Sequence, residues 1–276
     1  MSAVLNSETP GQAQAALISP PAGPFVQIEI TTKCNFECFY CAGRHMPQQN
    51  MPWEQYEQIL QKLGAAPLSV SLQGEGEPTA HPEFWPMVDR LIALGHWPYT
   101  ITNASLIDAD EAARKFPTIG VSVDTMDEVE AQRIGRYKLP NVLRRVSALV
   151  EAMGPSRVVV HTVAYGQDIA PVTSFVHALG AMHIVQPIQA KPDYAKHYGR
   201  ELPVSFWRHQ KRCRYLEQPL MRYFAVDGRE APCCYIKDMR LFDTAQRLRT
   251  TLAEGKVPGT CTGCREIAIP LSAKPQ

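Results

Sequence analysis

The sequence lacks a strong charge of either sign and a long hydrophobic run. Its 276 residues carry 28 Lys and Arg against 27 Asp and Glu, a formal net charge of +1. A chain this balanced has no overall electrostatic attraction for nucleic acid or another polyanion, so we expect no nucleic-acid partner. No uninterrupted apolar stretch approaches the roughly 20 residues that a membrane-spanning helix needs. We therefore expect no membrane partner either.

The amino-terminal stretch also lacks the features of a secretory signal. Residues 1–24 have neither a basic start nor a continuous apolar segment, and they are rich in Ala, Gln, Ser and Pro. This composition is typical of a flexible lead-in. We therefore predict a cytoplasmic protein whose folded part begins near residue 25. The remaining length is enough to bury a substantial hydrophobic core.

Eight cysteines are present, and in a protein predicted to stay in the cytoplasm they indicate metal binding rather than disulfides. They are unevenly distributed, with three in residues 34–41 and five in residues 213–264. This separation predicts two distinct cysteine sites.

The first group follows an alternating apolar run, residues 25–30, that predicts a β-strand. Cys34, Cys38 and Cys41 therefore lie on the loop that leaves the carboxyl end of this strand. Three thiolates at this spacing can each bind one iron of a cubic [4Fe–4S] cluster, which usually takes four cysteines. No fourth cysteine lies nearby, so one iron is left for a ligand that is not protein. The alternatives are scattered buried cysteines or a zinc site, which three closely spaced cysteines alone fit poorly.

The spacing Cys34-x3-Cys38-x2-Cys41, with Tyr40 before the last cysteine, resembles the signature of the radical S-adenosylmethionine (radical SAM) enzymes. The resemblance implies that the amino and carboxylate groups of SAM chelate the open iron. It also implies that reduction cleaves SAM to methionine and a 5′-deoxyadenosyl radical, which takes a hydrogen atom from the substrate. The partner implied for this step is an external one-electron reductant such as flavodoxin or ferredoxin.

Strand and helix patterns alternate six times between residue 25 and about residue 190. Strands are predicted at 25–30, 68–72, 99–102, 119–123, 157–163 and 183–188, and helices at 53–63, 82–94, 108–116, 141–153 and 169–179. Repeats of about 30 residues are typical of the βα units of a barrel. Six units predict an α/β fold, a partial (β/α)6 TIM-like barrel that is open. Active sites of barrels lie on the loops after the strands, where the first cysteine group falls.

Two other predicted strand ends resemble SAM-contact motifs of the same family. Gly76-Glu77-Pro78 follows the second strand, where Gly76 permits close backbone approach and the Glu77 carboxylate suits the SAM ammonium group. Asn103 follows the third strand, with Ala104 in place of the usual glycine. At both places the alternative is an ordinary turn.

The fourth strand ends in a Ser-x-Asp sequence that also resembles the family pattern. The resemblance implies that Ser122 hydrogen-bonds to the ribose or the carboxylate of SAM. Arg133, which we expect farther along the same loop, matches a position at which some members hold the SAM carboxylate. A solvent-exposed arginine is the alternative for Arg133. The sixth strand would lie against the adenine through the backbone around Val185 and Gln186.

Beyond residue 205 the pattern changes to a β-hairpin flanked by helices. Residues 220–226 and 230–236 predict its strands, joined by a turn at Asp227-Gly228. Cys233 and Cys234 then lie on the second strand with side chains on opposite faces, so both should not bind the same cluster. The flanking helices are predicted at about 206–216, which contains Cys213, and at about 243–254.

Cys213, Cys233 and the pair Cys261-x2-Cys264 resemble the twitch extension, the short form of the SPASM domain. That resemblance implies a second, auxiliary [4Fe–4S] cluster held by these four cysteines. A four-cysteine zinc site is the alternative. Cys234 is left over, either as a small buried residue or as a hydrogen-atom donor to a substrate radical.

Together the patterns predict a radical SAM core over residues 25–200 and a twitch- or SPASM-type domain over residues 201–276. The segment 189–203 either lines the substrate opening or links the two domains. Relatives with such extensions include peptide-modifying enzymes and cyclitol dehydrogenases. We therefore expect an oxidoreductase or maturase acting on a natural-product precursor, a ribosomal peptide or an aminocyclitol-like small molecule. The alternatives are an epimerase using Cys234 and a non-catalytic iron–sulfur or zinc protein.

Overall fold

The computed structural model describes residues 21, 23–189, 191–196, 198–199, 207–209, 212–218, 220–236 and 243–270. Most of the predicted lead-in lies outside these residues. The core strands are β1 (Phe25–Ile28), β2 (Ser69–Leu72), β3 (Trp97–Tyr99), β4 (Ile101–Thr102), β5 (Ile119–Ser122), β6 (Val158–Ala164) and β7 (Met182–Pro187). The helices of the same region are α2 (Trp53–Leu63), α3 (Phe84–Ala93), α4 (Ala109–Lys115), α5 (Glu128–Arg133), α6 (Leu139–Met153) and α7 (Ala170–Ala178).

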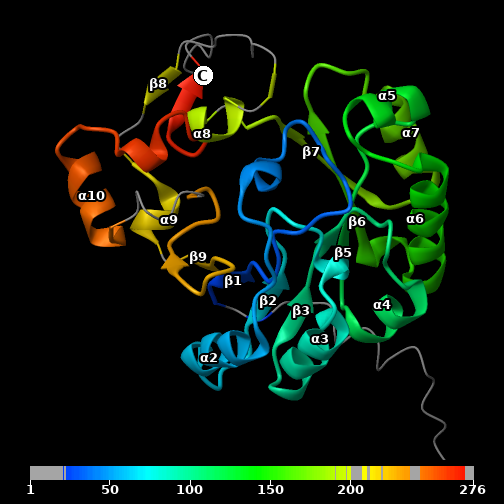
Figure 1. The fold of residues 1–276 in the computed structure, drawn as a ribbon, viewed down its shortest axis with the longest axis horizontal. Helices are drawn as coiled ribbons and strands as arrows, with labels where there is room; N and C mark the ends of the chain where they lie inside the picture. Colours follow the sequence, from blue (N-terminus) through cyan, green and yellow to red (C-terminus); the bar gives the residue numbers. More distant parts are fainter. Residues whose placement is uncertain are drawn as a thin grey trace, which may run out of the picture.

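The core strands run parallel to one another in chain order. β1 pairs with β2 and β2 with β3, while β4 pairs with β5, β5 with β6 and β6 with β7. The predicted third strand is divided at Thr100, whose hydroxyl donates to the Leu72 carbonyl at 2.7 Å and whose carbonyl accepts from the Gly120 amide at 2.9 Å. One residue thus joins the two sheets. The described strands form an open row, which confirms the predicted α/β fold with a partial barrel (Figure 1).

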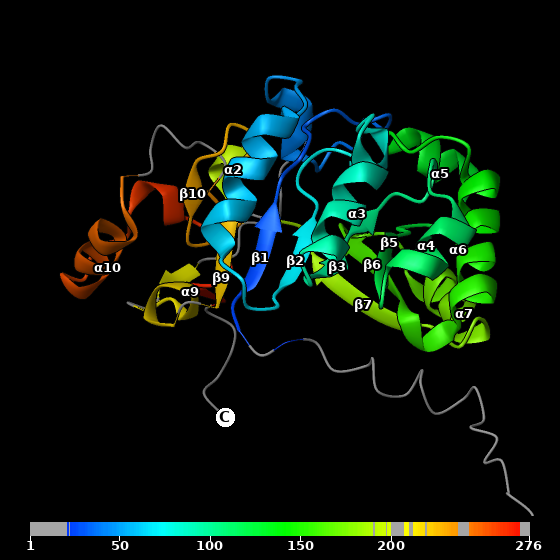
Figure 2. The same cartoon turned by 90° about the horizontal axis from the view of Figure 1, so that it is seen from below.

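Helices cover the outer side of this row (Figure 2). The predicted helix at 53–63 is α2, and Tyr56, Ile59, Leu60 and Leu63 are its buried residues. This spacing of three and four residues places them on one face, which packs onto the strands. Burying each such side chain contributes about 1.5–3 kcal/mol. None of the helices in the described ranges is both long and apolar enough to cross a bilayer.

The short helix α5 was not predicted, because we expected Arg133 to lie on a loop between the strand predicted at 119–123 and the helix predicted at 141–153. The Asp127 side chain caps this helix by accepting from the amides of Val129 and Glu130. Ala131 is its one buried residue, so the sequence has no apolar stripe there. Arg133 therefore ends a helix instead of lying in a loop.

The carboxyl-terminal region joins the core sheet directly. Its elements are α8 (Pro192–Ala195), β8 (Trp207–His209), α9 (Arg214–Glu217), β9 (Met221–Phe224), β10 (Glu230–Ala231), α10 (Ala245–Ala253) and β11 (Ala268–Pro270). β9 pairs in parallel with β1, and β10 pairs antiparallel with β9. The predicted hairpin is therefore present, and it extends the sheet on the side of β1. The domain boundary at residue 200 stays a prediction.

Two details of this region differ from the prediction. β10 ends at Ala231, because Pro232 has no amide hydrogen to continue the ladder, so Cys233 and Cys234 lie in the following turn. The argument that their side chains point to opposite faces of a strand therefore fails. The predicted helix at 206–216 is wrong at residues 207–209, which form β8 and pair with β11. It is correct only from Arg214, where α9 begins after Cys213.

His161 on β6 makes the stability of the fold dependent on pH. Burial, and then the charge of His183, lowers the pKa of His161 to about 4, from 6.5 for a free side chain. The unfolded chain thus binds more protons between these values, and stability is lost as the pH falls from about 6.5 to about 4. We expect His161→Gln to lose less unfolding free energy across this window than the unaltered chain, as measured by urea unfolding.

The exposed His177 on α7 provides the control for this experiment. His177→Gln should keep the pH dependence of the unaltered chain. If both variants show the same pH slope, His161 does not contribute to acid sensitivity.

Candidate active site

The loop after β1 carries Cys34, Cys38 and Cys41 beyond the carboxyl ends of the strands (Figure 2). Cys38 is buried, Cys41 is half-buried and Cys34 is exposed. The main chain between them is docked on the connection from α5 to α6. The Glu37 amide donates to the Gly135 carbonyl at 2.8 Å, and the Phe39 amide donates to the Ile134 carbonyl at 3.1 Å. The loop is thus held in place by backbone contacts.

The three thiols are close enough to influence one another. Burial, followed by the negative charges of Glu75 and Cys38, raises the pKa of the Cys41 thiol well above its usual range, and Cys34 adds to the effect. In the described ranges no three Cys, His, Asp or Glu side chains converge tightly enough to hold a single metal ion. A four-iron cube is larger than one ion and is bound by thiolates spread around its corners. The donor set therefore fits a [4Fe–4S] cluster better than zinc.

The loop after β2 passes directly against the cysteine loop. A Cβ on Gly76 would lie 2.5 Å from the Thr31 carbonyl oxygen and 2.6 Å from that of Lys33. The Glu77 amide donates to the same Lys33 oxygen at 2.8 Å. The backbone before the first cysteine therefore passes so close to residue 76 that only glycine fits there.

Glu77 is a buried carboxylate that is held by residues at the end of β4. It accepts from the Thr102 hydroxyl at 2.6 Å and from the Asn103 amide at 2.7 Å, while Thr79 donates from both its amide and its hydroxyl. Burial raises the pKa of Glu77, although these hydrogen bonds oppose the shift. The side chain thus ties the loop after β2 to the end of β4. Its pairing with the SAM ammonium group stays a prediction.

Asn103 is both a turn residue and a contact of the cysteine loop. Its Oδ1 accepts from the Ser105 amide at 2.9 Å, and its Nδ2 donates to Asn35 Oδ1 at 2.9 Å and lies 3.9 Å from Cys34 Sγ. Ala104 has a φ of 62°, in the left-handed region that favours glycine. Ala104 therefore adopts at this turn a conformation that glycine adopts without strain.

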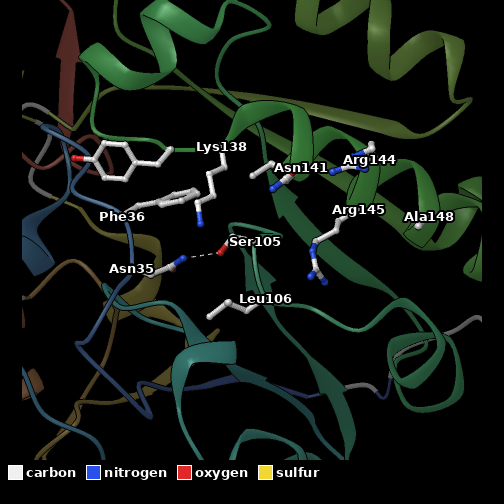
Figure 3. Close-up of a pocket in the computed structure, with 11 residues that line it drawn as sticks. Asn35, Phe36, Ser105, Leu106, Lys138, Asn141, Arg144, Arg145 and Ala148 are labelled. Atoms are coloured by element: carbon white, nitrogen blue, oxygen red, sulfur yellow. Dashed lines mark hydrogen bonds between the residues drawn. The ribbon is translucent and has the colours of Figure 1, made fainter.

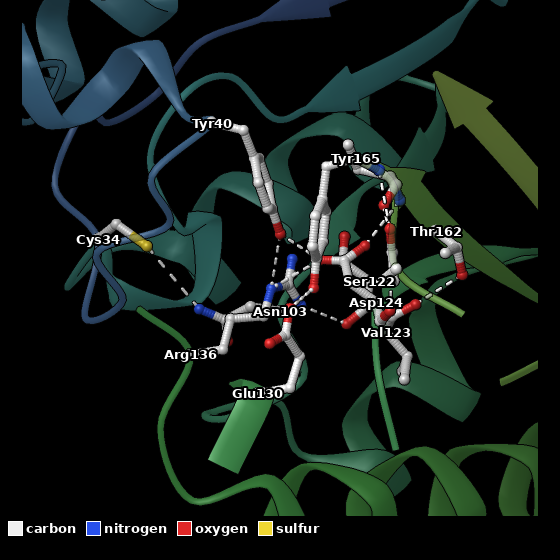
Figure 4. A network of polar contacts seen from close by, with 12 residues as sticks. Cys34, Tyr40, Asn103, Ser122, Val123, Asp124, Glu130, Arg136, Thr162 and Tyr165 are labelled. Carbon is white, nitrogen blue, oxygen red and sulfur yellow. Dashed lines mark hydrogen bonds and ion pairs between the residues drawn. The ribbon is translucent and has the colours of Figure 1, made fainter. Parts of the chain in front are cut away.

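A buried polar network connects the cysteine loop to the end of β5 (Figure 4). The Tyr40 hydroxyl donates to Asp124 Oδ2, and Arg136 Nε lies 2.8 Å from the same oxygen. Arg136 also donates to the Ser122 carbonyl at 2.8 Å, and the Val163 amide donates to Asp124 Oδ1 at 2.7 Å. Burial disfavours the charge on Arg136, but Asp124 and Tyr40 raise the pKa of this guanidinium well above its usual range.

Two arginines that follow β5 in the chain, Arg133 and Arg136, have different environments. The Arg133 side chain is 56% exposed and pairs with Glu130 at 2.5 Å, whereas that of Arg136 is 12% exposed. Sequence reasoning singled out Arg133 and missed Arg136, because only the tertiary contacts show which arginine is buried. The Ser122 side chain is half-buried, and its carbonyl is the group that Arg136 contacts. The SAM contacts of Ser122 and Arg133 stay predictions.

Aromatic side chains cover the cysteine loop. Tyr40 stacks on Tyr165 with ring centroids 5.8 Å apart, and Phe39 meets Tyr165 and Tyr198 edge-on at 5.4 Å and 6.0 Å. The Tyr194 hydroxyl donates to Glu75 Oε1 at 3.2 Å. The described part of the segment 189–203 therefore packs on the loop, and its role in lining a substrate opening stays a prediction. His197, Arg200 and residues 201–203 lie outside the described residues.

The carboxyl-terminal cysteines gather in one apolar cluster. Cys213 and Cys264 are buried in it, and Cys233, Cys234 and Cys261 pack against it half-buried. Burial raises the pKa of Cys264 to about 11, and it likewise raises the pKa of Cys233, with the charges of Cys234, Cys264 and Cys261 adding to that shift. The predicted four-cysteine set is thus brought together, and Cys234 lies in the same cluster.

Lys191 and Arg265 lie between the carboxyl-terminal cysteine cluster and other parts of the chain. The buried Lys191 ammonium donates to the Tyr235 carbonyl and lies 5.8 Å from the centre of the Tyr194 ring. Its positive charge lowers the pKa of Cys264, although burial of that thiol dominates. Arg265 donates to Gln186 on β7 at 3.3 Å. The adenine contact predicted for Val185 and Gln186 stays a prediction.

Residues 28–179, more than half of the chain, match the family described as the Radical SAM superfamily. A GTP 3′,8-cyclase of Paracoccus denitrificans is 33% identical over 172 residues, covering 55% of this chain and 48% of that protein. An S-adenosylmethionine-dependent nucleotide dehydratase of Selenomonas ruminantium is 31% identical over 109 residues, covering 37% and 39%. The chain spans less than half the length of these relatives.

Two solved structures share the fold over most of the chain. Streptococcus suis SuiB bound to precursor peptide SuiA has a TM-score of 0.65 at 15% identity, covering 87% of this chain and 67% of SuiB. BtrN in complex with AdoMet and 2-DOIA has a TM-score of 0.50 at 12% identity, covering 86% and 89%. At this identity the likeness concerns the fold alone.

Gly135 is where a substitution should disturb the cysteine loop. Its φ is +86°, and an added Cβ would lie 2.1 Å from the Glu37 carbonyl oxygen. We expect Gly135→Ala to lower the unfolding free energy by about 1–3 kcal/mol. Because the loop is pushed outward, iron and sulfide bound after anaerobic reconstitution should also fall.

Gly154→Ala is the matched control, because Gly154 has a φ of +84° and nothing within 4 Å of the added Cβ. It should lose stability through backbone strain but keep its iron. Equal iron loss in both variants would show that the contact with Glu37 does not position the loop.

Proposed function

This chain belongs to the radical SAM superfamily, and we propose that it oxidises a natural-product precursor, a ribosomal peptide or an aminocyclitol-like small molecule. The observation that carries the proposal is the position of Cys34, Cys38 and Cys41 on one loop after β1, next to loops that carry the buried carboxylates of Glu77 and Asp124. Membership of the family implies SAM and a [4Fe–4S] cluster. The substrate and a second cluster are the parts that we add.

Cys34, Cys38 and Cys41 would hold the first cluster. When bound, the cluster supplies the electron that splits SAM into methionine and a 5′-deoxyadenosyl radical. The protein's own residues place SAM against the cysteine loop. In our proposal Glu77 pairs with the SAM ammonium group, and Asn103 keeps the adjoining turn against Cys34.

The ribose and carboxylate of SAM are assigned to the opposite side of the site. Ser122 at the end of β5 and Arg133 at the end of α5 would donate to these groups. Tyr40 would contact SAM from the cysteine loop, where its ring stacks on Tyr165. Phe39, Tyr165 and Tyr198 would exclude water from the reacting atoms, which prevents loss of a reactive radical to solvent.

The carboxyl-terminal cysteines would complete the oxidation. Transfer of a hydrogen atom from the substrate gives 5′-deoxyadenosine, and loss of one more electron and one proton makes the net change a two-electron oxidation. Cys213, Cys233, Cys261 and Cys264 would hold the auxiliary [4Fe–4S] cluster that accepts this electron. The buried Lys191 ammonium near these cysteines offsets the negative charge that accumulates there.

The share of this chain that aligns with each known protein supports the proposed substrate class. The structures named for a precursor peptide and for 2-DOIA align with 87% and 86% of the chain, so they include the carboxyl-terminal region. The relatives named for GTP and nucleotides align with only 55% and 37%. A nucleotide is nevertheless the second candidate substrate, because these relatives are 33% and 31% identical. The hydrogen-donor role of Cys234 stays a prediction that depends on the substrate reaching that cysteine cluster.

Replacing Cys34, Cys38 and Cys41 together with Ala should reduce 5′-deoxyadenosine formation from SAM to background. The physical reason is that no thiolates remain on the loop to bind iron. The measurement is chromatography of anaerobic reactions containing a chemical reductant, with peptide, aminocyclitol and nucleotide substrates tried in parallel. Cys234→Ala is the control and should still cleave SAM. Cleavage at the original rate by the triple variant would remove the proposed mechanism.

Anaerobic reconstitution should give about eight irons per chain, four for each cube. Replacing both Cys261 and Cys264 with Ala should reduce this to about four, because the second site loses half of its ligands. Elemental analysis for iron, sulfide and zinc measures the outcome. If the unaltered chain binds stoichiometric zinc and the double variant does not, the second site is a zinc site and not an auxiliary cluster.

A further inference from the structure

The outer side of the first cysteine loop borders a large surface cavity. This cavity has a volume of about 830 Å³ and lies between the loop, the turn after β4 and the first turns of α6 (Figure 3). Asn35 and Phe36 form one wall, and Ser105 lies opposite, with Asn35 Nδ2 donating to Ser105 Oγ at 2.8 Å. The cavity is thus built partly from the residues that directly follow Cys34.

The charged side chains that line the cavity are all of one sign. Lys138, Arg144 and Arg145 line it, and its described lining contains no Asp or Glu. All three cations are exposed, and Figure 3 shows the Lys138 and Arg145 side chains extending into the space that Ser105 borders. The two arginines donate to neutral groups: Arg144 to the Asn141 side chain and Arg145 to the Ile107 carbonyl at 2.6 Å. A chain of net charge +1 therefore concentrates three positive charges at one depression.

The position of the cavity matches the path that an incoming electron needs. Cys34 is the exposed cysteine of the loop, and Asn35 and Phe36 beside it form the cavity wall. The other side of the loop is covered by Phe39, Tyr40 and the aromatic residues packed on them. The cavity thus approaches the first cysteine site from solvent, away from the aromatic cover.

We propose that this basic cavity is the docking surface for a small acidic one-electron carrier protein. The inference rests on the proposed function, which requires one electron for each SAM cleaved. The carrier is oxidised by one electron, and that electron breaks the sulfur–carbon bond of SAM. Methionine leaves, and the 5′-deoxyadenosyl fragment takes a hydrogen atom from the substrate. Complementary charge raises the association rate of such partners and makes it sensitive to salt.

The test compares two electron sources in the reconstituted full-length protein. The variant combines Lys138→Glu, Arg144→Glu and Arg145→Glu, and 5′-deoxyadenosine formation is driven either by a reduced acidic flavodoxin or by reduced methyl viologen. At low salt the flavodoxin-driven rate should fall about tenfold or more, because attraction becomes repulsion. The rate with methyl viologen, a small cation, should stay within about twofold, since it needs no docking surface.

Two further variants keep the test decisive. Lys62→Glu, Arg247→Glu and Lys256→Glu together make the same change in net charge at exposed positions on α2, on α10 and just after α10, and should leave both rates unchanged. The neutral variant of Lys138→Gln, Arg144→Gln and Arg145→Gln should give a smaller, salt-dependent loss with flavodoxin alone, and it replaces the charge reversal if that chain does not fold.

Three outcomes would overturn the proposal that the cavity is a docking surface. They are an unchanged flavodoxin-driven rate in both cavity variants, an equal loss in the control variant, or a parallel loss with both electron sources. A parallel loss would mean that the cavity serves SAM, the substrate or folding. If the unaltered chain does not cleave SAM even with methyl viologen, the proposed function fails instead, so the two failures are distinguishable.

Discussion

The buried Asp124 carboxylate is the contact on which the geometry of the first cysteine site depends. Its side chain is 0% exposed, and it receives the Tyr40 hydroxyl, the Arg136 guanidinium and the Val163 amide. A buried charge is costly unless it is paired and hydrogen-bonded, and these three donors come from three different parts of the chain. Asp124 therefore holds the cysteine loop, the start of α6 and β6 in one arrangement.

The parallel pairing of β9 with β1 gives the two cysteine sites a common support. The first cysteine loop leaves the end of β1, and the turn after β9 reaches the same end, where the Val226 amide lies 3.4 Å from Glu29 Oε2. Glu29 also accepts from the Glu75 amide at 2.9 Å. One buried carboxylate thus connects the loop after β2 with the carboxyl-terminal hairpin. The first cysteine loop and the carboxyl-terminal hairpin are therefore both attached to β1.

The sequence predicted those parts of the fold that repeat locally. The apolar spacing of α2 and α6 marks the face that packs on the strands, and both helices were predicted within two residues of their bounds. Helix α5 escaped prediction because a capping Asp and one buried Ala leave no periodic signal. At the site, Asn103 and Glu77 were predicted and do adjoin the cysteine loop, whereas Arg136 and Tyr165 were missed. Their burial depends on partners distant in the sequence.

The cysteine spacing and the alternation of strands and helices by themselves determined the family, the open parallel fold and the edge of the sheet at which the first cysteine loop lies. Such features depend on neighbours within a few residues, so the sequence contains them directly. Only the tertiary structure decided that Arg136 and not Arg133 meets Tyr40, that Gly76 makes room for the backbone of Lys33, and that β9 extends the sheet at β1. Each of these depends on which distant surfaces meet in the folded chain, and local periodicity does not specify such long-range pairings.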